Sequence, residues 1–219
     1  MVHLGLHVNC ITMTFKTEQE EFWAGDFGND YIGRNKGDDY LASNLNFFSK
    51  AFSQVGKPAS LIEFGANIGM NLKAIQLLFP SIDLYGIEIN AHAAKALSEV
   101  IPQSNIFKGS IFDYSAPEQY DVSLIKGVLI HINPDNLADV YDRLYRASKK
   151  YVLICEYYNP SPVTIKYRGH KDKLFKRDFA GDMMDKYTDL TLVDYGFCYK
   201  RDRAFPQDDI TWFLLQKNN

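Results

Sequence analysis

The chain has 219 residues, of which 46% are hydrophobic and 23% are charged, as is typical of a single globular domain. Its formal net charge of −3 gives no reason to expect nucleic acid or an anionic membrane surface as a partner. Three widely spaced cysteines form neither a disulfide framework nor a zinc-site spacing, and no apolar run approaches the ~18 residues of a membrane span, so we expect a cytoplasmic protein.

The N-terminal residues differ from the rest of the chain. Polar, helix-compatible sequence begins only after Met13. We therefore expect residues 1–16 to be a disordered extension, without the basic region and long apolar region of an export signal. No internal repeat or low-complexity linker divides residues 17–219, which we expect to form one domain.

Strands and helices alternate through most of this domain. From residue 38, Leu41, Leu45, Phe48, Phe52 and Val55 recur at spacings of four and three, which predicts a helix. Apolar runs predict strands at 60–64, 82–88, 105–110, 120–126 and 151–157. Helices are expected at 69–79, from Asn90 to before Pro102, and from Asn133 onward.

The C-terminal third departs from this alternation. A polar and aromatic segment runs from Tyr158 to about residue 173, followed by a helix near 176–187. Two final strands, at 190–199 and 210–216, have no helix-length segment between them. The sequence therefore predicts an α/β fold with a mostly parallel, seven-stranded, doubly wound sheet that ends in an antiparallel hairpin. This layout resembles that of Rossmann-like class I S-adenosylmethionine (SAM) methyltransferases.

A glycine turn follows the first strand in LIEFGANIGM. Gly65 and Gly69 are four residues apart, whereas the outer glycines of a dinucleotide fingerprint are five apart. With Glu63 in front, the pattern resembles motif I of SAM methyltransferases. Asn67 replaces the middle glycine but tolerates left-handed backbone angles. The resemblance implies that Glu63, Gly65, Ala66, Asn67 and Gly69 hold the methionine end of SAM, although any strand–glycine–helix junction needs small residues.

Three later strand ends strengthen this interpretation. Glu88 lies 19 residues after Gly69, where an acid can accept hydrogen bonds from both ribose hydroxyls, although a surface glutamate at a strand end is commonplace. Ser110 follows the third strand, where methyltransferases hold the adenine. The segment from Lys126 to His131 resembles the stretch beside the methyl group, although Val128–Ile130 could simply be core. The implied cofactor contacts are Glu88, Ile89, Ser110, Ile111, Lys126 and Gly127.

The ends of the chain narrow the resemblance. The block FWAGDFGNDYIGRN, the segment 157–187 and FPQDDITWFLLQK are similar to the pseudaminic acid biosynthesis-associated methylases. This family implies methyl transfer from SAM, with S-adenosylhomocysteine (SAH) as product, to a small acceptor that is sugar-derived, from a nonulosonic acid pathway, or anionic. We expect a monomer or a homodimer.

Residues 17–36 form a candidate lid. Trp23, Phe27 and Tyr31 supply three rings, and Arg34 supplies a cation beside flexible glycines. We hypothesise that this lid closes over SAM, with Tyr31 and Arg34 near its carboxylate, because a guanidinium can donate two hydrogen bonds to a carboxylate. The alternative is an amphipathic helix packed on the domain, with Arg34 in solvent.

The acceptor side should be built from the fourth and fifth strand ends and from the insert at 157–187. Candidate catalytic residues are His131, Glu156 and Tyr157, although His131 could instead cap or orient the next helix. Candidate substrate-binding residues are Tyr158, Tyr167, Arg168 and His170, although the basic residues here could be a solvated loop. No spacing resembles a metal site, so we expect no metal.

Two other functions remain open. The chain could bind SAM or SAH as a regulator or scaffold without turnover, and the missing middle glycine slightly favours this. A nicotinamide oxidoreductase is disfavoured by the glycine spacing and by the terminal hairpin.

Overall fold

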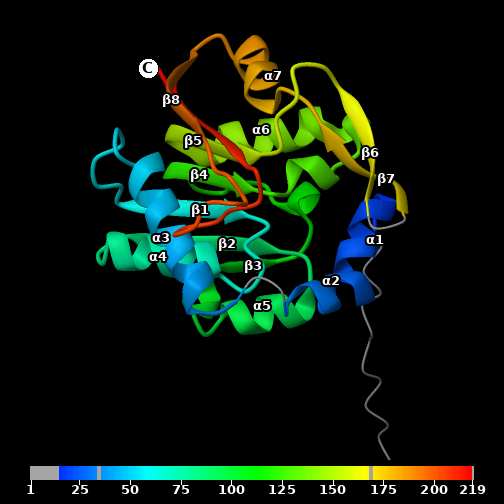
Figure 1. The fold of residues 1–219 in the computed structure, drawn as a ribbon, viewed down its shortest axis with the longest axis horizontal. Coiled ribbons are helices and arrows are strands. Elements are labelled where there is room, and N and C mark those ends of the chain that lie inside the picture. Colours follow the sequence, from blue (N-terminus) through cyan, green and yellow to red (C-terminus); the bar gives the residue numbers. More distant parts are fainter. Residues whose placement is uncertain (1–14, 34–35, 168–169, 219) are drawn as a thin grey trace, which may run out of the picture.

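A seven-stranded sheet forms the centre of the molecule (Figure 1). The computed structural model describes residues 15–33, 36–167 and 170–218, excluding the side chains of 166–173. The strand order is β3-β2-β1-β4-β5-β9-β8, and β9 runs antiparallel to both of its neighbours. The strands are β1 (Ser60–Phe64), β2 (Asp83–Glu88), β3 (Ile106–Lys108), β4 (Tyr120–Lys126), β5 (Ser148–Glu156), β8 (Leu190–Phe197) and β9 (Thr211–Lys217). The predicted fold class is confirmed.

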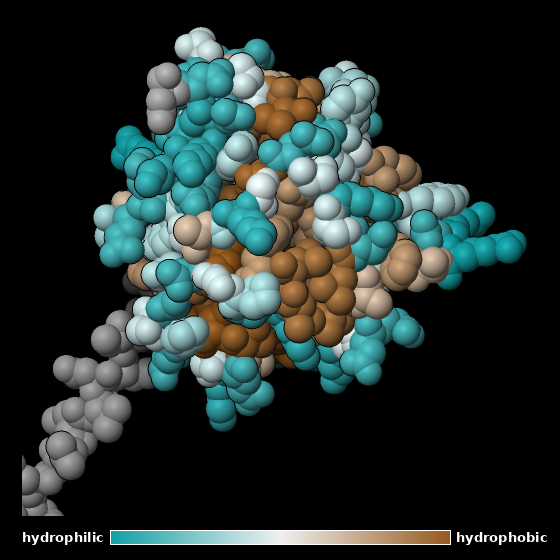
Figure 2. Space-filling view, turned by 90° about the vertical axis from the view of Figure 1, so that its left-hand side faces the viewer, coloured by the Kyte–Doolittle hydropathy of each residue, from teal (hydrophilic) through white to brown (hydrophobic). Residues whose placement is uncertain are grey.

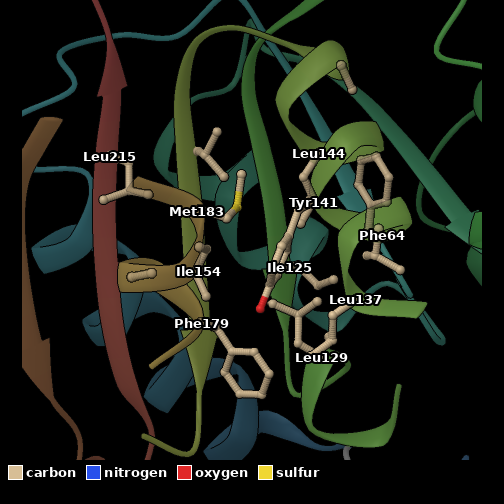
Figure 3. Packing of buried hydrophobic residues seen from close by; sticks show 14 of the residues in the cluster. Phe64, Ile125, Leu129, Leu137, Tyr141, Leu144, Ile154, Phe179, Met183 and Leu215 are labelled. Carbon is tan, nitrogen blue, oxygen red and sulfur yellow. The ribbon is translucent and has the colours of Figure 1, made fainter. Parts of the chain in front are cut away.

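Helices cover both faces of this sheet and create two hydrophobic cores. One core packs α6 (Leu137–Ala147) and α7 (Phe179–Lys186) on the sheet. Figure 3 shows Leu144 and Met183 from these helices pointing toward Ile125 of β4 and Ile154 of β5. The other core lies under α3 (Asp38–Ala51), α4 (Met70–Leu78) and α5 (Ala91–Leu97). Central strands covered on both faces explain the continuous apolar runs in the sequence.

The segment after β5 differs from the expectation. It contains a hairpin of β6 (Val163–Tyr167) and β7 (His170–Lys176), which form a separate two-stranded sheet. Val163, Thr164 and Ile165 favour a strand because they are β-branched. The many charged residues of β7 hid this preference in the sequence. Both strands of this polar and aromatic segment were therefore missed in the prediction from the sequence.

The bounds of other elements also differ from the predicted ranges. The helix expected from Asn133 begins as the 3₁₀ turn η4 (Pro134–Asn136), and α6 follows it. β5 starts at Ser148, three residues before the predicted 151. Three further 3₁₀ turns connect the elements: η1 (Gln103–Asn105), η2 (Ile111–Asp113) and η3 (Leu129–His131).

The glycine turn between β1 and α4 has the left-handed backbone expected of it. Asn67 has φ 48°, and Gly65 and Gly69 have φ 78° and 81°. A Cβ on Gly65 would lie 2.6 Å from Cγ2 of Val128, and one on Gly69 would lie 2.7 Å from Cδ1 of Leu97. The two glycines are thus required by both backbone angle and packing, whereas asparagine is accommodated at position 67.

Hydrophobic side chains also reach the surface. Figure 2 shows a patch of hydrophobic residues on one face of the molecule. On the edge strand β8, Leu192, Tyr195 and Phe197 are exposed. Across the described ranges, no helix has the length and apolar character needed to span a membrane.

Candidate active site

A cavity lies where the chain order of the sheet reverses. β2 and β4 lie on opposite sides of β1, so the loops after these strands diverge and leave a crevice at their carboxyl ends. The cavity is lined by the glycine turn after β1 and by residues that follow β2, β3, β4 and β5. Residues of the N-terminal helices α1 (Glu18–Ala24) and α2 (Asp26–Tyr31) complete its wall.

Glu88, a predicted cofactor-binding residue, places a buried carboxyl group in this wall. Its Oε2 accepts a hydrogen bond from the backbone N–H of Asn67 at 2.7 Å, and Oε1 accepts one from that of Asn90 at 2.8 Å. Burial raises the pKa of Glu88 above its ordinary value, while the N–H donors of Asn90 and Asn67 act in the opposite direction. The carboxyl group therefore also ties the glycine turn to the start of α5.

Glu63 and Gly69 lie behind the cavity rather than in its wall. Gly65, Ala66 and Asn67 line the cavity, but Gly69 packs against Leu97 and Val100. Glu63 is 0% exposed, and its Oε1 accepts a hydrogen bond from Nδ2 of Asn71 at 2.6 Å. A ligand would meet Asn71, which lines the cavity, before it met Glu63. Burial raises the pKa of Glu63 to about 8.

The loop after β3 lines the end of the cavity where adenine was expected. Ser110 and Ile111 of this loop lie in the cavity wall, as does Ile89, which follows β2. The hydroxyl of Ser110 accepts a hydrogen bond from the N–H of Phe112 at 3.0 Å and so caps η2. Arg143 of α6 donates to the carbonyl of Phe112, which fixes η2 from the other side.

Lys126 and Gly127 lie at the end of β4, in the wall. The Lys126 ammonium is 5.9 Å from the ring centroid of Tyr40 and 5.8 Å from that of Phe47. Burial acts to lower the pKa of Lys126, but neighbouring groups, first Tyr40 and then Cys155, Glu63 and Asp208, raise it above its ordinary value. Gly127 has φ 69°, and a Cβ there would meet no heavy atom within 4 Å. Its backbone therefore stays open to a ligand.

The N-terminal block gathers its rings as expected. The Trp23 ring contacts those of Phe27 and Tyr31, with centroids 5.3 and 5.2 Å apart, and it lies 4.7 Å from the His131 ring. Trp23 and Tyr31 line the cavity. The side chain of Asn90 holds this block to the domain, since its Nδ2 donates to Oδ1 of Asn29 at 2.9 Å.

Part of the N-terminal prediction lies outside the described residues. This applies to Arg34 and to residues 1–14 of the expected extension. Lys16, at the end of that extension, forms a salt bridge with Asp113 of η2 at 2.7 Å. The N-terminal segment thus contacts η2 through Lys16 and the start of α5 through Asn29.

Gly28 leaves no room for a side chain beside the end of α1, and its substitution tests this packing. A Cβ at this position would lie 1.9 Å from the carbonyl oxygen of Trp23 and 2.9 Å from Nδ2 of Asn90. We expect Gly28→Ala to lower the free energy of unfolding by about 1–3 kcal/mol, as overpacking does. Thermal unfolding measures this. Gly33→Ala, where a Cβ meets nothing within 4 Å, is the control. Equal melting temperatures for Gly28→Ala and wild type would contradict the packing.

On the acceptor side, three predicted residues converge. His131 of η3 is 7% exposed and lines the cavity together with Glu156 and Tyr157. Oε1 of Glu156 accepts the N–H groups of Val128 and Leu129, both at 2.9 Å, so this carboxyl group holds the turn after β4. Burial raises the pKa of Glu156 to about 7.

The predicted substrate-binding residues are placed less favourably. Tyr158 is 41% exposed, packs 5.9 Å from the Phe213 ring and does not line the cavity, because it follows Tyr157 and points the other way. Arg168 and the side chains of Tyr167 and His170 lie outside the described part of the chain. Lys176, at the end of the β6–β7 hairpin, lies near the site. Its ammonium is 4.9 Å from the Tyr157 ring centroid.

Several lining residues were not predicted: Thr17, Gln19, Glu20, Tyr40, Asn71, Asn90, Asp208 and Ile210. Asn71 could have been found, because it lies in the first turn of the helix after the glycine turn. Tyr40 and Asp208 carry no local signal, since only the tertiary fold brings α3 and the β8–β9 connection to the cavity. Among the described residues, no group of three His, Cys, Asp or Glu side chains could hold a metal ion.

Comparisons with known proteins support the fold. No protein-family model matches the sequence, and no curated protein matches it significantly. A solved structure of 1,6-didemethyltoxoflavin-N1-methyltransferase from Burkholderia thailandensis, with SAH bound, is 13% identical at a TM-score of 0.68, covering 92% of this chain and 87% of that one. Magnesium protoporphyrin IX methyltransferase from Synechocystis PCC 6803, also with SAH, is 12% identical at 0.65, covering 91% and 98%.

A third neighbour is longer than this chain. The mitomycin 7-O-methyltransferase is 16% identical at a TM-score of 0.66, and the match covers 92% of this chain but 61% of that one. Similarity at this level of identity shows the fold. The chain therefore has the Rossmann-like fold of class I SAM-dependent methyltransferases, while its similarity to the pseudaminic acid-associated methylases stays a prediction.

Proposed function

We propose that this protein transfers a methyl group from SAM to a small-molecule acceptor. The observation that carries the proposal is the cavity at the switch point of the sheet, where the glycine turn, the Glu88 carboxyl group and the loop at Ser110 meet. The fold and the SAH-bound neighbours support the same choice of cofactor.

The charges in the cavity wall fit a cationic nucleoside. Among the described lining residues, the carboxyl groups are Glu20, Glu88, Glu156 and Asp208, while the only ammonium is that of Lys126. Carboxyl groups that can ionise beside a bound cation suit a sulfonium, and four of them with one ammonium do not suit the pyrophosphate of a dinucleotide. Oε2 and Oε1 of Glu88 accept the N–H groups of Asn67 and Asn90, and as a carboxylate the group keeps a lone pair for a ribose hydroxyl. Gly65, Asn67, Asn71 and Lys126 would surround the amino-acid end.

Bound SAM would supply a methyl group on a positively charged sulfur. The protein's own task is then to align the acceptor and exclude water. Trp23 and Tyr31 close the cavity from the N-terminal side. His131 is the group best placed to take a proton from an acceptor hydroxyl or ammonium, because its ring lines the cavity, whereas Oε1 of Glu156 holds two backbone N–H groups and Oε2 is fully buried.

We further propose a sugar-derived or anionic acceptor from a nonulosonic acid pathway. The resemblance of the chain ends supports this, as does the basic sequence of the β6–β7 hairpin, KYRGHKDKLFK. β7 contacts η3, which carries His131, so the hairpin lies next to the acceptor side of the cavity.

Ligand binding followed by turnover tests the function. SAM or SAH at 100 times its dissociation constant should stabilise the protein by about 2.7 kcal/mol in thermal unfolding, and NAD should not. Methyl transfer from labelled SAM would then be measured with free and nucleotide-linked nonulosonic acids and with uncharged sugars. Stabilisation by NAD alone would refute the proposal. Tight SAM binding without turnover on any acceptor would favour a regulator or scaffold instead.

A His131→Gln variant tests the proposed proton acceptor. Glutamine keeps a polar side chain but cannot take a proton at neutral pH, so we expect kcat to fall by about 10²–10⁴. The dissociation constant for SAM should change little. Steady-state kinetics between pH 6 and 9, with calorimetry for SAM, would measure both. An unchanged kcat and pH profile would exclude His131 as the base.

A further inference from the structure

A chain of side-chain amides connects the segment between β8 and β9 to the carboxyl group of Glu63. Nε2 of Gln207 donates to Oδ1 of Asn44 at 2.9 Å, and Nδ2 of Asn44 donates to Oδ1 of Asn71 at 3.1 Å. Nδ2 of Asn71 then donates to Oε1 of Glu63 at 2.6 Å. Gln207, Asn44 and Glu63 are 7%, 0% and 0% exposed, whereas Asn71 is partly buried and faces the cavity, so the chain meets the solvent-accessible cavity at Asn71.

This chain has a direction. A side-chain amide carries donors on one side and an acceptor on the other, so a linear series of amides points all its donors the same way. Here every donor points toward Glu63. Hydrogen bonds donated to a carboxyl group favour its ionised form, and buried amides polarise one another along a chain. The arrangement is therefore suited to stabilise a negative charge on Glu63.

The surroundings of Glu63 oppose that charge when no ligand is bound. Its Oε2 is buried and has no hydrogen-bond partner among the described residues. The groups that face it are Asn71 from α4, Lys126 from β4, Glu88 from β2 and Cys155 from β5. Burial is the largest influence, and with a pKa of about 8 the Glu63 carboxyl group is mostly protonated at pH 7.

We propose that binding of the amino-acid end of the cofactor releases the proton of Glu63 to solvent, and that Gln207, Asn44 and Asn71 are positioning residues that stabilise the resulting carboxylate. The inference rests on the proposed function, because the ligand's ammonium supplies the positive charge. Asn71 and Lys126 line the cavity and transmit the change, since both also face Glu63. One O–H bond of Glu63 breaks, and the buffer takes up the proton.

Calorimetry counts this proton directly. SAH is titrated into the protein at pH 7 in phosphate and in Tris, whose ionisation enthalpies differ, and the difference in observed heat gives the protons released. We expect wild type to release close to one proton more than Glu63→Gln. In wild type, the dissociation constant for SAH should fall by up to roughly tenfold for each unit by which the pH rises toward 8. This contribution to the pH dependence should be absent in Glu63→Gln.

One further variant and two controls separate the effect of the amide chain from that of the ligand's ammonium group. Gln207→Met removes the first donor without a large change in shape and should release fewer protons, with weaker SAH binding. Gln76→Met, a glutamine of α4 that bonds only the carbonyl of Pro80 among the described residues, should behave as wild type. Methylthioadenosine, which lacks the amino-acid end, should bind with equal proton release in wild type and in Glu63→Gln.

The outcomes separate this inference from the proposed function. If wild type does not bind SAH, both fail. If SAH binds tightly and Glu63→Gln releases as many protons as wild type, the inference alone is overturned. Should Glu63→Gln not fold, the comparison of wild type with Gln207→Met decides, because equal proton release and equal pH dependence of the dissociation constant would overturn it as well.

Discussion

Replacing Glu88 with glutamine is expected to weaken SAM binding by roughly 10- to 100-fold. The carboxyl group accepts backbone N–H groups from both Asn67 and Asn90, and in the proposed complex it also accepts the ribose hydroxyls. A glutamine has one acceptor oxygen, so its NH₂ group must face at least one of these donors. Losing a buried hydrogen bond to a charged group costs about 1.5–3 kcal/mol, which corresponds to this range of affinity.

Calorimetric titration of SAM measures the effect, and thermal unfolding shows whether the variant remains folded. Asp83→Asn is the matched control, because Asp83 starts the same strand but is exposed at its other end. The control should bind SAM as wild type does. A folded Glu88→Gln protein with an unchanged dissociation constant would show that Glu88 holds the turn and does not contact the nucleoside.

The sequence predicted the fold well where local signals are strong. The strand at 60–64 agrees with β1, and the tolerance of Asn67 for a left-handed backbone is confirmed. The β6–β7 hairpin was missed because charged residues on a small separate sheet leave no continuous apolar run. A small sheet of this kind buries few side chains, so the alternation of apolar and polar residues along its strands is weak.

The site was predictable to the extent that strand ends determine it. Residues at or just beyond the carboxyl ends of parallel strands, such as Glu88, Ser110 and Gly127, must lie at one edge of the sheet. Which side chain faces the cavity depends on packing, and this is why Glu63 lies behind Asn71. Asp208 reaches the cavity from the C-terminal hairpin, and no spacing in the sequence encodes that contact.

The stability of the ligand-free protein is expected to fall as the pH rises from about 5 to 8. Burial raises the pKa of Glu156 to about 7 and that of Glu63 to about 8, from an ordinary value of 4.5. The folded state thus holds these protons more tightly than the unfolded state. Their contribution is fully present below about pH 4.5 and is lost as the pH rises through the folded-state pKa. At 1.36 kcal/mol per pKa unit, Glu156 alone contributes roughly 3 kcal/mol.

Substitutions can assign this loss of stability to each carboxyl group. Glu156→Gln should remove the loss of stability that is complete near pH 7. Glu63→Gln should also reduce the change in the free energy of unfolding between pH 7 and 8. Urea unfolding at pH 5, 6, 7 and 8 gives the free energies, with the exposed Glu99→Gln as control. If both variants keep the wild-type slope, the two carboxyl groups are already ionised in the ligand-free protein. Neither could then lose a proton on binding the cofactor, so this measurement also bears on the proposed coupling without any ligand being present.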